Sequence, residues 1–175
     1  PEAPDLSKLE IADKWVLHRM NTLVAEVTGN LDGFELGLAA QKVYDFIWTE
    51  FCDWYIEIAK PRLYGQDAEA KRLVSSVLRL VLKIGMKLLH PFMPFITEEI
   101  FLQLSDESTI MLSSWPTVND AYAFPAESEC MEALMELVRS IRNLRAEMKV
   151  PSAQRIDLRL LCKPDQAEAC RSMAA

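Results

Sequence analysis

Apolar residues recur at spacings of three and four along most of this chain, a pattern typical of amphipathic α-helices. Ser7 is the predicted N-cap of the first helix, with Glu10 at the capping-box position, and Gly29 is the predicted end of that helix. Pro61 is expected to end the second. In all, the pattern predicts five helices, over residues 8–28, 34–60, 67–89, 94–104 and 126–149. The predicted fold is an all-α, up-and-down bundle of about five helices.

The second predicted helix holds more aromatic surface than one buried stripe needs. Trp48 and Tyr55 are expected to flank its core stripe, while Phe46 is expected on a mostly acidic side with Glu50. The core stripe itself is predicted to consist of Tyr44, Ile47, Phe51, Trp54 and Ile58. Some of the remaining rings must therefore have another role.

After Pro151 the pattern changes. A strand is predicted where every second residue is apolar, at Ile156, Leu158, Leu160 and Cys162. A helix-like run starts at residue 164. One strand cannot stand alone. We therefore expect two domains, a helical bundle over residues 1–151 and the start of an incomplete α/β subdomain over residues 152–175.

Length and composition fit a soluble domain. The chain has 175 residues, half of them hydrophobic, and only five glycines. It lacks an initiator Met, so we expect an excised piece of a larger protein. No apolar run resembles a signal peptide or a membrane span, which indicates a cytoplasmic protein without a membrane partner.

Charge and reactive residues exclude several function classes. A net charge of −7 argues against a general nucleic-acid binder, so any RNA contact must be local. The four cysteines form no CxxC pair and no metal-ligand motif with His18 and His90. No glycine-rich phosphate loop and no nucleophile–base pattern occurs. We therefore expect no metal site and no catalytic residues in this chain.

The first helix offers one candidate RNA contact. Trp15 and Arg19 are predicted to share a face away from the main apolar stripe. Single-stranded RNA stacks its bases on aromatic rings and guanidinium planes, and both groups are present here. The alternative is that Trp15 packs under a loop and Arg19 pairs with a carboxylate.

A second candidate lies where the second helix ends. The C-terminal end of this helix carries two cations and an aromatic ring, those of Lys60, Arg62 and Tyr64. They could contact RNA, although cations near a helix C-terminus are also explained by the helix dipole.

Two helices carry basic stripes that could contact phosphates. Arg79, Lys83 and Lys87 share a stripe of the third helix with Arg72 and Ser76. On the fifth helix, Arg142 and Arg145 belong to a basic second half. The alternatives are an ordinary solvated face and favourable charges near a helix end.

Four sequence blocks resemble the valyl-tRNA synthetases. They occur in order and extend from Ala12 to Pro151, so the resemblance covers most of the chain. The blocks are ADKWVLHRMN at 12–21, FCDWYIEIAKPRLYG at 51–65, HPFMPFITEEI at 90–100 and IRNLRAEMKVP at 141–151.

The resemblance implies the helical anticodon-binding domain of a class I aminoacyl-tRNA synthetase, with an anticodon surface built from the first helix and the region after the second. It implies a parent enzyme that joins valine to its tRNA with ATP and Mg²⁺, with catalytic and editing domains upstream in the same polypeptide and a C-terminal segment downstream. Two alternatives stay open. One is the same domain of an isoleucyl or leucyl sibling, and the other is a non-catalytic helical module that binds a protein partner.

Overall fold

The computed structural model describes residues 3–151 and 154–157, and these residues divide into two compact units. The first unit ends at Pro125 and the second begins at Ala126. The helices of the first unit are α1 (Ile11–Asp32), α2 (Leu36–Asp45), the π-helix η2 (Phe46–Ile56), α3 (Glu57–Tyr64), α4 (Ala68–Leu89) and α5 (Pro94–Leu104). Three short 3₁₀ turns accompany them, η1 (Leu6–Lys8), η3 (Ile110–Leu112) and η4 (Asp120–Tyr122). Helix α6 (Pro125–Glu147) starts at the last residue of the first unit, and all of its other residues belong to the second unit.

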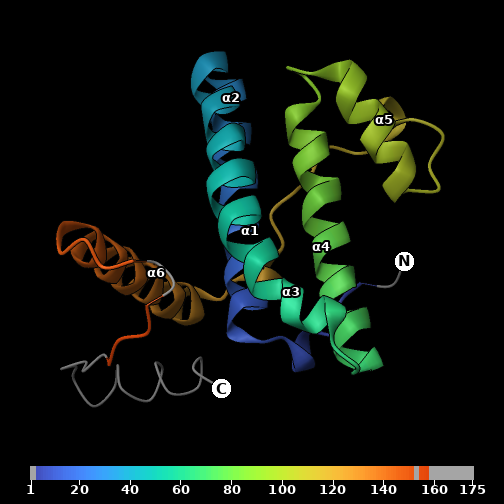
Figure 1. Cartoon of the computed structure of the whole chain (residues 1–175). Coiled ribbons are helices and arrows are strands. Elements are labelled where there is room, and N and C mark those ends of the chain that lie inside the picture. Colours follow the sequence, from blue (N-terminus) through green and yellow to red (C-terminus); the bar gives the residue numbers. More distant parts are fainter. Residues whose placement is uncertain (1–2, 152–153, 158–175) are drawn as a thin grey trace. The chain divides into compact units, whose positions relative to one another are not determined.

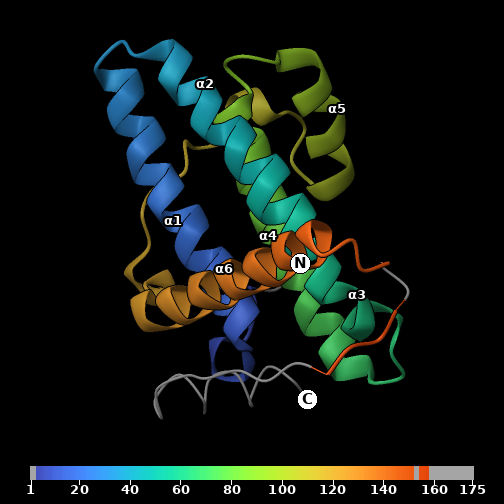
Figure 2. The same cartoon turned by 60° about the vertical axis from the view of Figure 1, so that its left-hand side comes forward.

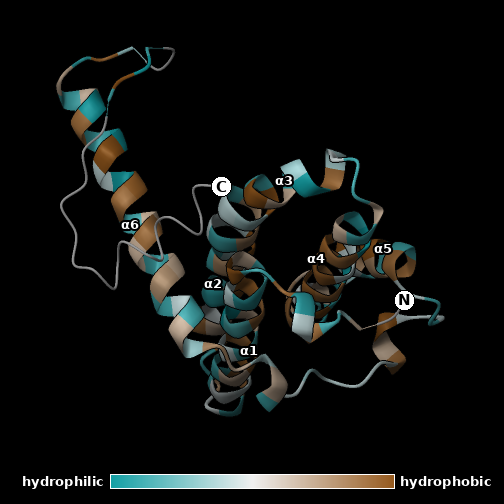
Figure 3. Ribbon diagram, turned by 90° about the horizontal axis from the view of Figure 1, so that it is seen from below, coloured by the Kyte–Doolittle hydropathy of each residue, from teal (hydrophilic) through white to brown (hydrophobic). Residues whose placement is uncertain are grey.

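The first unit is an up-and-down bundle, as the sequence predicts. Helix α1 runs antiparallel to the continuous helical stretch formed by α2, η2 and α3, and α4 then packs against both α1 and α3 (Figures 1 and 2). Helix α5 folds back against α4. Apolar and polar segments alternate along these helices (Figure 3), as amphipathic packing requires. The all-α fold class is confirmed.

The π-helix η2 changes which side chains of the second helix face the core. Its turns are wider than α-helical turns, so the buried positions are spaced four and then three residues apart up to Phe46, five apart from Phe46 to Phe51, and four apart after that. The side chains of Val43, Phe51, Tyr55 and Ala59 are all buried. The predicted stripe is therefore only partly right. Tyr44 is 58% exposed.

Phe46 and Tyr55 correct the sequence analysis most clearly. Phe46, expected on the acidic side, is only 3% exposed and belongs to the core. Tyr55, expected at the edge of the core stripe, is fully buried. Trp54, expected in the stripe, is only partly buried. The shifted register of the π-helix accounts for all three differences.

Three predicted helix ends are wrong. Helix α1 is capped by Glu10, whose side chain forms a capping box with Asp13, and Ser7 instead lies in the turn η1. The helix continues past Gly29 to Asp32. Helix α3 also continues through Pro61 and ends at Tyr64, directly before Gly65. A Cβ atom at Gly65 would lie 2.9 Å from the carbonyl oxygen of Pro61, so glycine permits this close turn.

Helix α1 has neighbours on more than one side, which explains its wide buried face. The segment after α5 returns across it, and Asn21 of α1 exchanges two hydrogen bonds with the backbone of Asn119, at 2.8 and 3.1 Å. Trp115 Nε1 donates a hydrogen bond to Thr28 Oγ1 at 2.9 Å. The segment that follows α5, which contains η3 and η4, therefore covers part of α1.

The predicted strand lies almost entirely outside the described residues. Residues 154–157 have no regular secondary structure, and residues 158–162 together with the helix-like run after 164 are outside the described part. The boundary after residue 151 stays a prediction. Within residues 3–151 and 154–157, none of the helices combines the length and the apolar character needed to cross a bilayer.

Candidate nucleic-acid interface

Arg19 lies beside a cavity between α1 and the stretch formed by α2 and η2. Its guanidinium bonds the Glu50 carboxylate through two atoms, with Nε to Oε2 at 2.7 Å and Nη2 to Oε1 at 2.8 Å. The Arg19 side chain stays 35% exposed and that of Glu50 19% exposed. This bidentate pair fixes the plane of the guanidinium.

The cavity, here called the α1–α2 cavity, has a volume of about 310 Å³ and walls rich in charge. Glu26 accepts a hydrogen bond from Lys42 Nζ at 2.9 Å, and Asp45 accepts one from Gln41 at 2.8 Å. Two cations and three carboxylates line the space, which gives it a net charge of −1. The lining residues are Arg19, Leu23, Glu26, Lys42, Asp45, Phe46 and Glu50. Such walls suit the donor and acceptor edge of a nucleobase better than a phosphate.

Phe34 is an exposed ring that the sequence analysis did not identify. It lies in the turn between α1 and α2 with a φ of 59°, and its side chain is 90% exposed. A positive φ is costly for an aromatic residue, and here it accompanies two backbone hydrogen bonds that end α1, from Glu35 N to the Asn30 carbonyl at 2.7 Å and from Phe34 N to the Leu31 carbonyl at 3.0 Å. The available signal was its position directly after Asp32-Gly33, because an aromatic residue in a tight turn has few neighbours to bury it.

The α2–η2 stretch carries a second exposed aromatic feature. Tyr44 and Trp48 stack with their ring centroids 6.4 Å apart and their planes 10° from parallel. They are 58% and 60% exposed. Sequence analysis placed Tyr44 in the core, and the π-helical register explains why it lies outside.

Arg62 is a structural residue of the bundle. Its guanidinium bonds both oxygens of Asp13, at 2.6 and 2.7 Å, and Asp13 is fully buried. Tyr55 donates a hydrogen bond to Asp13 at 2.7 Å. Burial, together with the nearby negative charge of Asp13, raises the pKa of Tyr55 far above its ordinary value. This network joins α3 and η2 to the start of α1.

The other predicted residues at these two places have different environments. Trp15 is only 1% exposed, so its predicted position away from the core is wrong and its ring cannot stack on a base. Its Nε1 atom has no hydrogen-bond partner among the described residues. Lys60 is exposed and pairs with Glu57, while Tyr64 is 80% exposed.

The predicted basic stripe of α4 divides into two parts. Lys83 bonds Glu107 at 2.7 Å and Ser105 at 2.9 Å, and Lys87 bonds the Ser114 carbonyl at 3.2 Å. Both ammonium groups lie over the Phe101 ring. Burial lowers the pKa of Lys87. These two lysines tie α4 to α5 and the following loop, whereas Arg79 is exposed.

Helix α6 carries the remaining candidates. Arg142 is exposed, and Arg145 is partly buried and donates hydrogen bonds to the carbonyls of Pro151 and Gln154, at 2.6 and 3.0 Å. Arg145 therefore holds the segment that follows α6. No group of three or more potential metal ligands occurs among residues 3–151 and 154–157.

Comparisons with known proteins agree with a nucleic-acid role. A family model described as the anticodon-binding domain of tRNA ligase matches residues 13–160. Valine–tRNA ligase of Clostridium perfringens is 52% identical over 152 residues, which are 86% of this chain and 17% of that protein. The valine–tRNA ligases of Clostridium acetobutylicum and Carboxydothermus hydrogenoformans are 46% and 47% identical over 94% and 95% of the chain, and 19% of each relative is covered. The chain thus spans about a fifth of the length of the relatives it matches.

Proposed function

This chain belongs to the family of anticodon-binding domains of tRNA ligases, and from this premise we propose that it recognises the anticodon of a valine-accepting tRNA within a valine–tRNA ligase. The observation that carries the proposal is the position of Arg19. It is held by Glu50 at a cavity whose walls present both hydrogen-bond donors and carboxylate acceptors. A splayed anticodon base needs such a surface, because its edge offers donors and acceptors together.

The ring at the turn between α1 and α2 adds a second contact in the proposal, about 20 Å from Arg19 along the helix. Phe34 presents a flat apolar face that any unstacked base can cover. Base stacking on Phe34 supplies affinity without regard to sequence, while hydrogen bonds at the α1–α2 cavity supply selectivity. Lys60, Tyr64 and Arg142 stay candidates for further RNA contacts because all three are exposed.

The parent enzyme supplies the chemistry in this proposal. It attaches valine to the tRNA with ATP and Mg²⁺ in the cytoplasm, through domains that lie elsewhere in the polypeptide. The chain described here contributes binding energy and selectivity, which raise the rate only for the tRNA with the correct anticodon.

One observation favours a second candidate function. The stacked and exposed pair Tyr44–Trp48 is the kind of aromatic surface found at protein interfaces. A protein-interaction module would lose its partner with Trp48→Ala and keep its tRNA binding. An anticodon-binding domain would instead lose tRNA recognition when Arg19 is changed.

The test of the proposed function uses the full-length ligase. Arg19→Gln should lower discrimination between the valine tRNA and a version altered in the middle anticodon base by about 1 to 3 kcal/mol, because a bidentate-quality base contact is lost. Charging rates of the two tRNAs measure the effect. Lys71→Gln removes the same charge from an exposed position outside the α1–α2 cavity and should leave discrimination unchanged.

Glu50→Gln separates base reading from structural support. It weakens the Arg19–Glu50 pair but keeps the guanidinium, so discrimination should fall less than in Arg19→Gln. If Arg19→Gln instead slows the charging of both tRNAs equally, Arg19 has a general or structural role and the proposal fails.

A further inference from the structure

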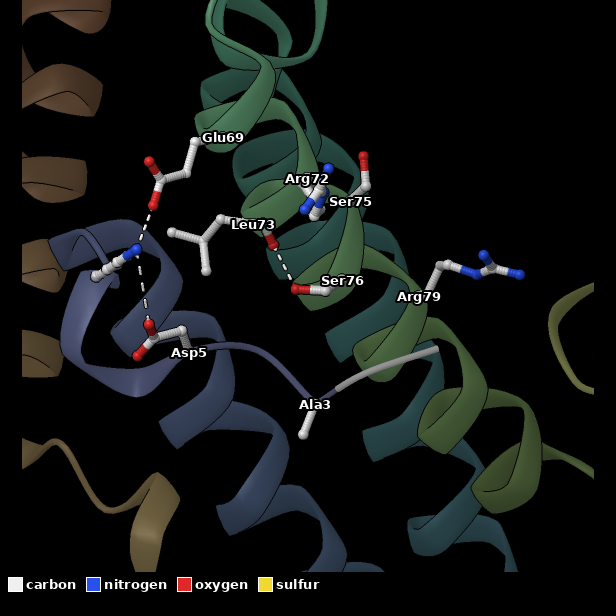
Figure 4. A pocket seen from close by; sticks show the side chains of 9 residues that line it. Ala3, Asp5, Glu69, Arg72, Leu73, Ser75, Ser76 and Arg79 are labelled. Atoms are coloured by element: carbon white, nitrogen blue, oxygen red, sulfur yellow. Dashed lines mark hydrogen bonds and ion pairs between the residues drawn. The ribbon is translucent and has the colours of Figure 1, made fainter.

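A larger cavity lies at the other end of α1, between the N-terminal segment and the first turns of α4. It has a volume of about 490 Å³, and Arg72, Ser76 and Arg79 follow one another along its α4 wall (Figure 4). Ala3 and Asp5 form part of the facing wall. We call it the α4 cavity.

The charges of the α4 cavity leave two guanidinium groups uncompensated. Lys8 bonds Glu69 and lies 3.9 Å from Asp5, so this one cation is shared by both carboxylates of the cavity. Arg72 and Arg79 form no hydrogen bond or ion pair with another residue of the described chain. Three cations and two carboxylates line the space, a net charge of +1 in a protein whose net charge is −7.

The sequence of α4 explains why these arginines stay unpaired. Residues three and four positions away on a helix are the natural partners of a charged side chain. Around Arg79 these positions hold Ser75, Ser76, Leu82 and Lys83, none of them acidic. Arg72 has one acidic neighbour of this kind, Glu69, and Lys8 already bonds it. Both guanidinium groups are therefore available to an external anion.

We propose that the α4 cavity binds a phosphate group through Arg72 and Arg79. The two arginines are two helical turns apart on one face, about 10 Å along the axis, so they flank the cavity instead of meeting at one atom. Guanidinium groups bind phosphate oxygens in a bidentate manner, so two unpaired guanidinium groups at one cavity form a candidate anion site.

This inference deepens the proposed function and rests on it for the source of the phosphate. A site near the start of α1 lies about 12 Å from Arg19 and about 30 Å from the turn between α1 and α2, measured along this helix at 1.5 Å per residue. We assign the α4 cavity to a backbone phosphate of the tRNA outside the anticodon loop. Contacts to phosphates position the RNA without reading its sequence.

The test compares single and double variants of the 175-residue chain. Arg72→Gln, Arg79→Gln and the double variant are measured for binding to the valine tRNA and to the tRNA with an altered anticodon, at several salt concentrations. The double variant should bind both tRNAs at least tenfold more weakly and to the same extent. The slope of log affinity against log salt should fall by about one for each arginine removed.

Lys71→Gln is the matched control. It removes one positive charge from the same helix, and Lys71 is exposed and does not line the cavity. It should change the salt slope by much less than Arg79→Gln does. Because Arg72 and Arg79 are exposed and unpaired, the thermal midpoints of their variants should match that of the unchanged chain.

A second arm tests the cavity without RNA. Titration with inorganic phosphate, followed by the side-chain NMR signals of the arginines, should give saturable shifts for Arg72 and Arg79 that the double variant lacks. Such shifts with unchanged tRNA affinity would support the cavity and assign it to a small phosphorylated ligand. No phosphate-dependent shift together with unchanged tRNA binding would overturn the inference. Discrimination between the two tRNAs tests the proposal for Arg19, whereas equal weakening of both tRNAs tests the proposal for Arg72 and Arg79. The two proposals can therefore fail separately.

Discussion

The four arginines in residues 3–125 fall into two pairs with opposite surroundings. Arg19 and Arg62 each bond a carboxylate through two nitrogens, whereas Arg72 and Arg79 have no partner among the described residues. The cavities beside them differ in the same sense, since the α1–α2 cavity has a net charge of −1 and the α4 cavity a net charge of +1. The comparison teaches that the pairing of each arginine, more than the charge of the whole chain, decides what it can bind.

The largest expected effect concerns the buried member of the paired class. Asp13→Ala should lower the free energy of unfolding by about 3 to 5 kcal/mol, because it leaves the mostly buried side chain of Arg62 and the Tyr55 hydroxyl without their partner. Urea unfolding measures this. Glu50→Ala breaks the more exposed Arg19 pair and should cost clearly less. Similar losses for the two variants would remove the distinction between a structural and a binding arginine.

The next largest effect concerns the exposed ring of Phe34, which we propose stacks on a base of the tRNA. Phe34→Gly should weaken tRNA binding by about 1 to 3 kcal/mol through lost base stacking. It should also raise the free energy of unfolding by up to about 1 kcal/mol, because glycine adopts a positive φ without strain. Phe34→Ala, as the control, should weaken binding equally without the gain in stability. Unchanged tRNA affinity in both variants would exclude Phe34 from the RNA surface.

The pH dependence of stability sharpens the description of the Arg62 network. The folded protein raises the pKa of Tyr55 far above its ordinary value near 10, whereas unfolded Tyr55 loses its proton near pH 10. Below this pH both states hold the proton, and above it only the folded state does. The free energy of unfolding should therefore fall by up to about 1.4 kcal/mol per pH unit as pH rises above 10.

Tyr55→Phe is the control for this effect. This variant should lack the fall in the free energy of unfolding that Tyr55 causes above pH 10. It should keep the pH dependence that comes from all other titratable groups. An identical pH profile for the variant and the unchanged chain, measured by urea unfolding between pH 8 and 11, would show that Tyr55 is not the source.

The smallest effect is expected at the surface pair Lys60–Glu57. Lys60→Gln should change the free energy of unfolding by less than about 0.5 kcal/mol, because exposed ion pairs contribute little. Arg62→Gln, two residues further along the same helix, should cost several times more. A loss above 1 kcal/mol for Lys60→Gln would mean that exposure does not separate the ion pairs of this bundle.

Most of the fold could be predicted because the apolar periodicity of α4 and α5 is uninterrupted. The predicted ranges 67–89 and 94–104 agree with Ala68–Leu89 and Pro94–Leu104. The second helix could not be predicted in detail, because no residue pattern in the sequence indicates the π-helical turns of Phe46–Ile56. An α-helical period then assigns Tyr44 to the core and Phe46 to the surface, the reverse of what is found.

The candidate site could be predicted only in part, because periodicity reports one face of a helix and not how many neighbours cover it. Trp15 lies on the side of α1 opposite its main stripe, yet additional elements pack there and bury it. Neither Arg19 nor Arg62 has its carboxylate partner nearby in the sequence, and only the folded structure shows that Glu50 holds Arg19 and Asp13 holds Arg62. The α4 cavity depends on contacts between residues far apart in the sequence, such as Lys8 and Glu69, which are 61 positions apart and which no local pattern contains.

Site-specific crosslinking is the most direct test of the central claim that this chain recognises the anticodon. A photoreactive benzoylphenylalanine replaces Phe34 in one sample and Arg79 in another, and each is irradiated with the valine tRNA. Primer extension then maps the crosslinked nucleotides. The account predicts crosslinks from position 34 to the anticodon and from position 79 to nucleotides outside the anticodon loop. Crosslinks from position 34 that avoid the anticodon would contradict it.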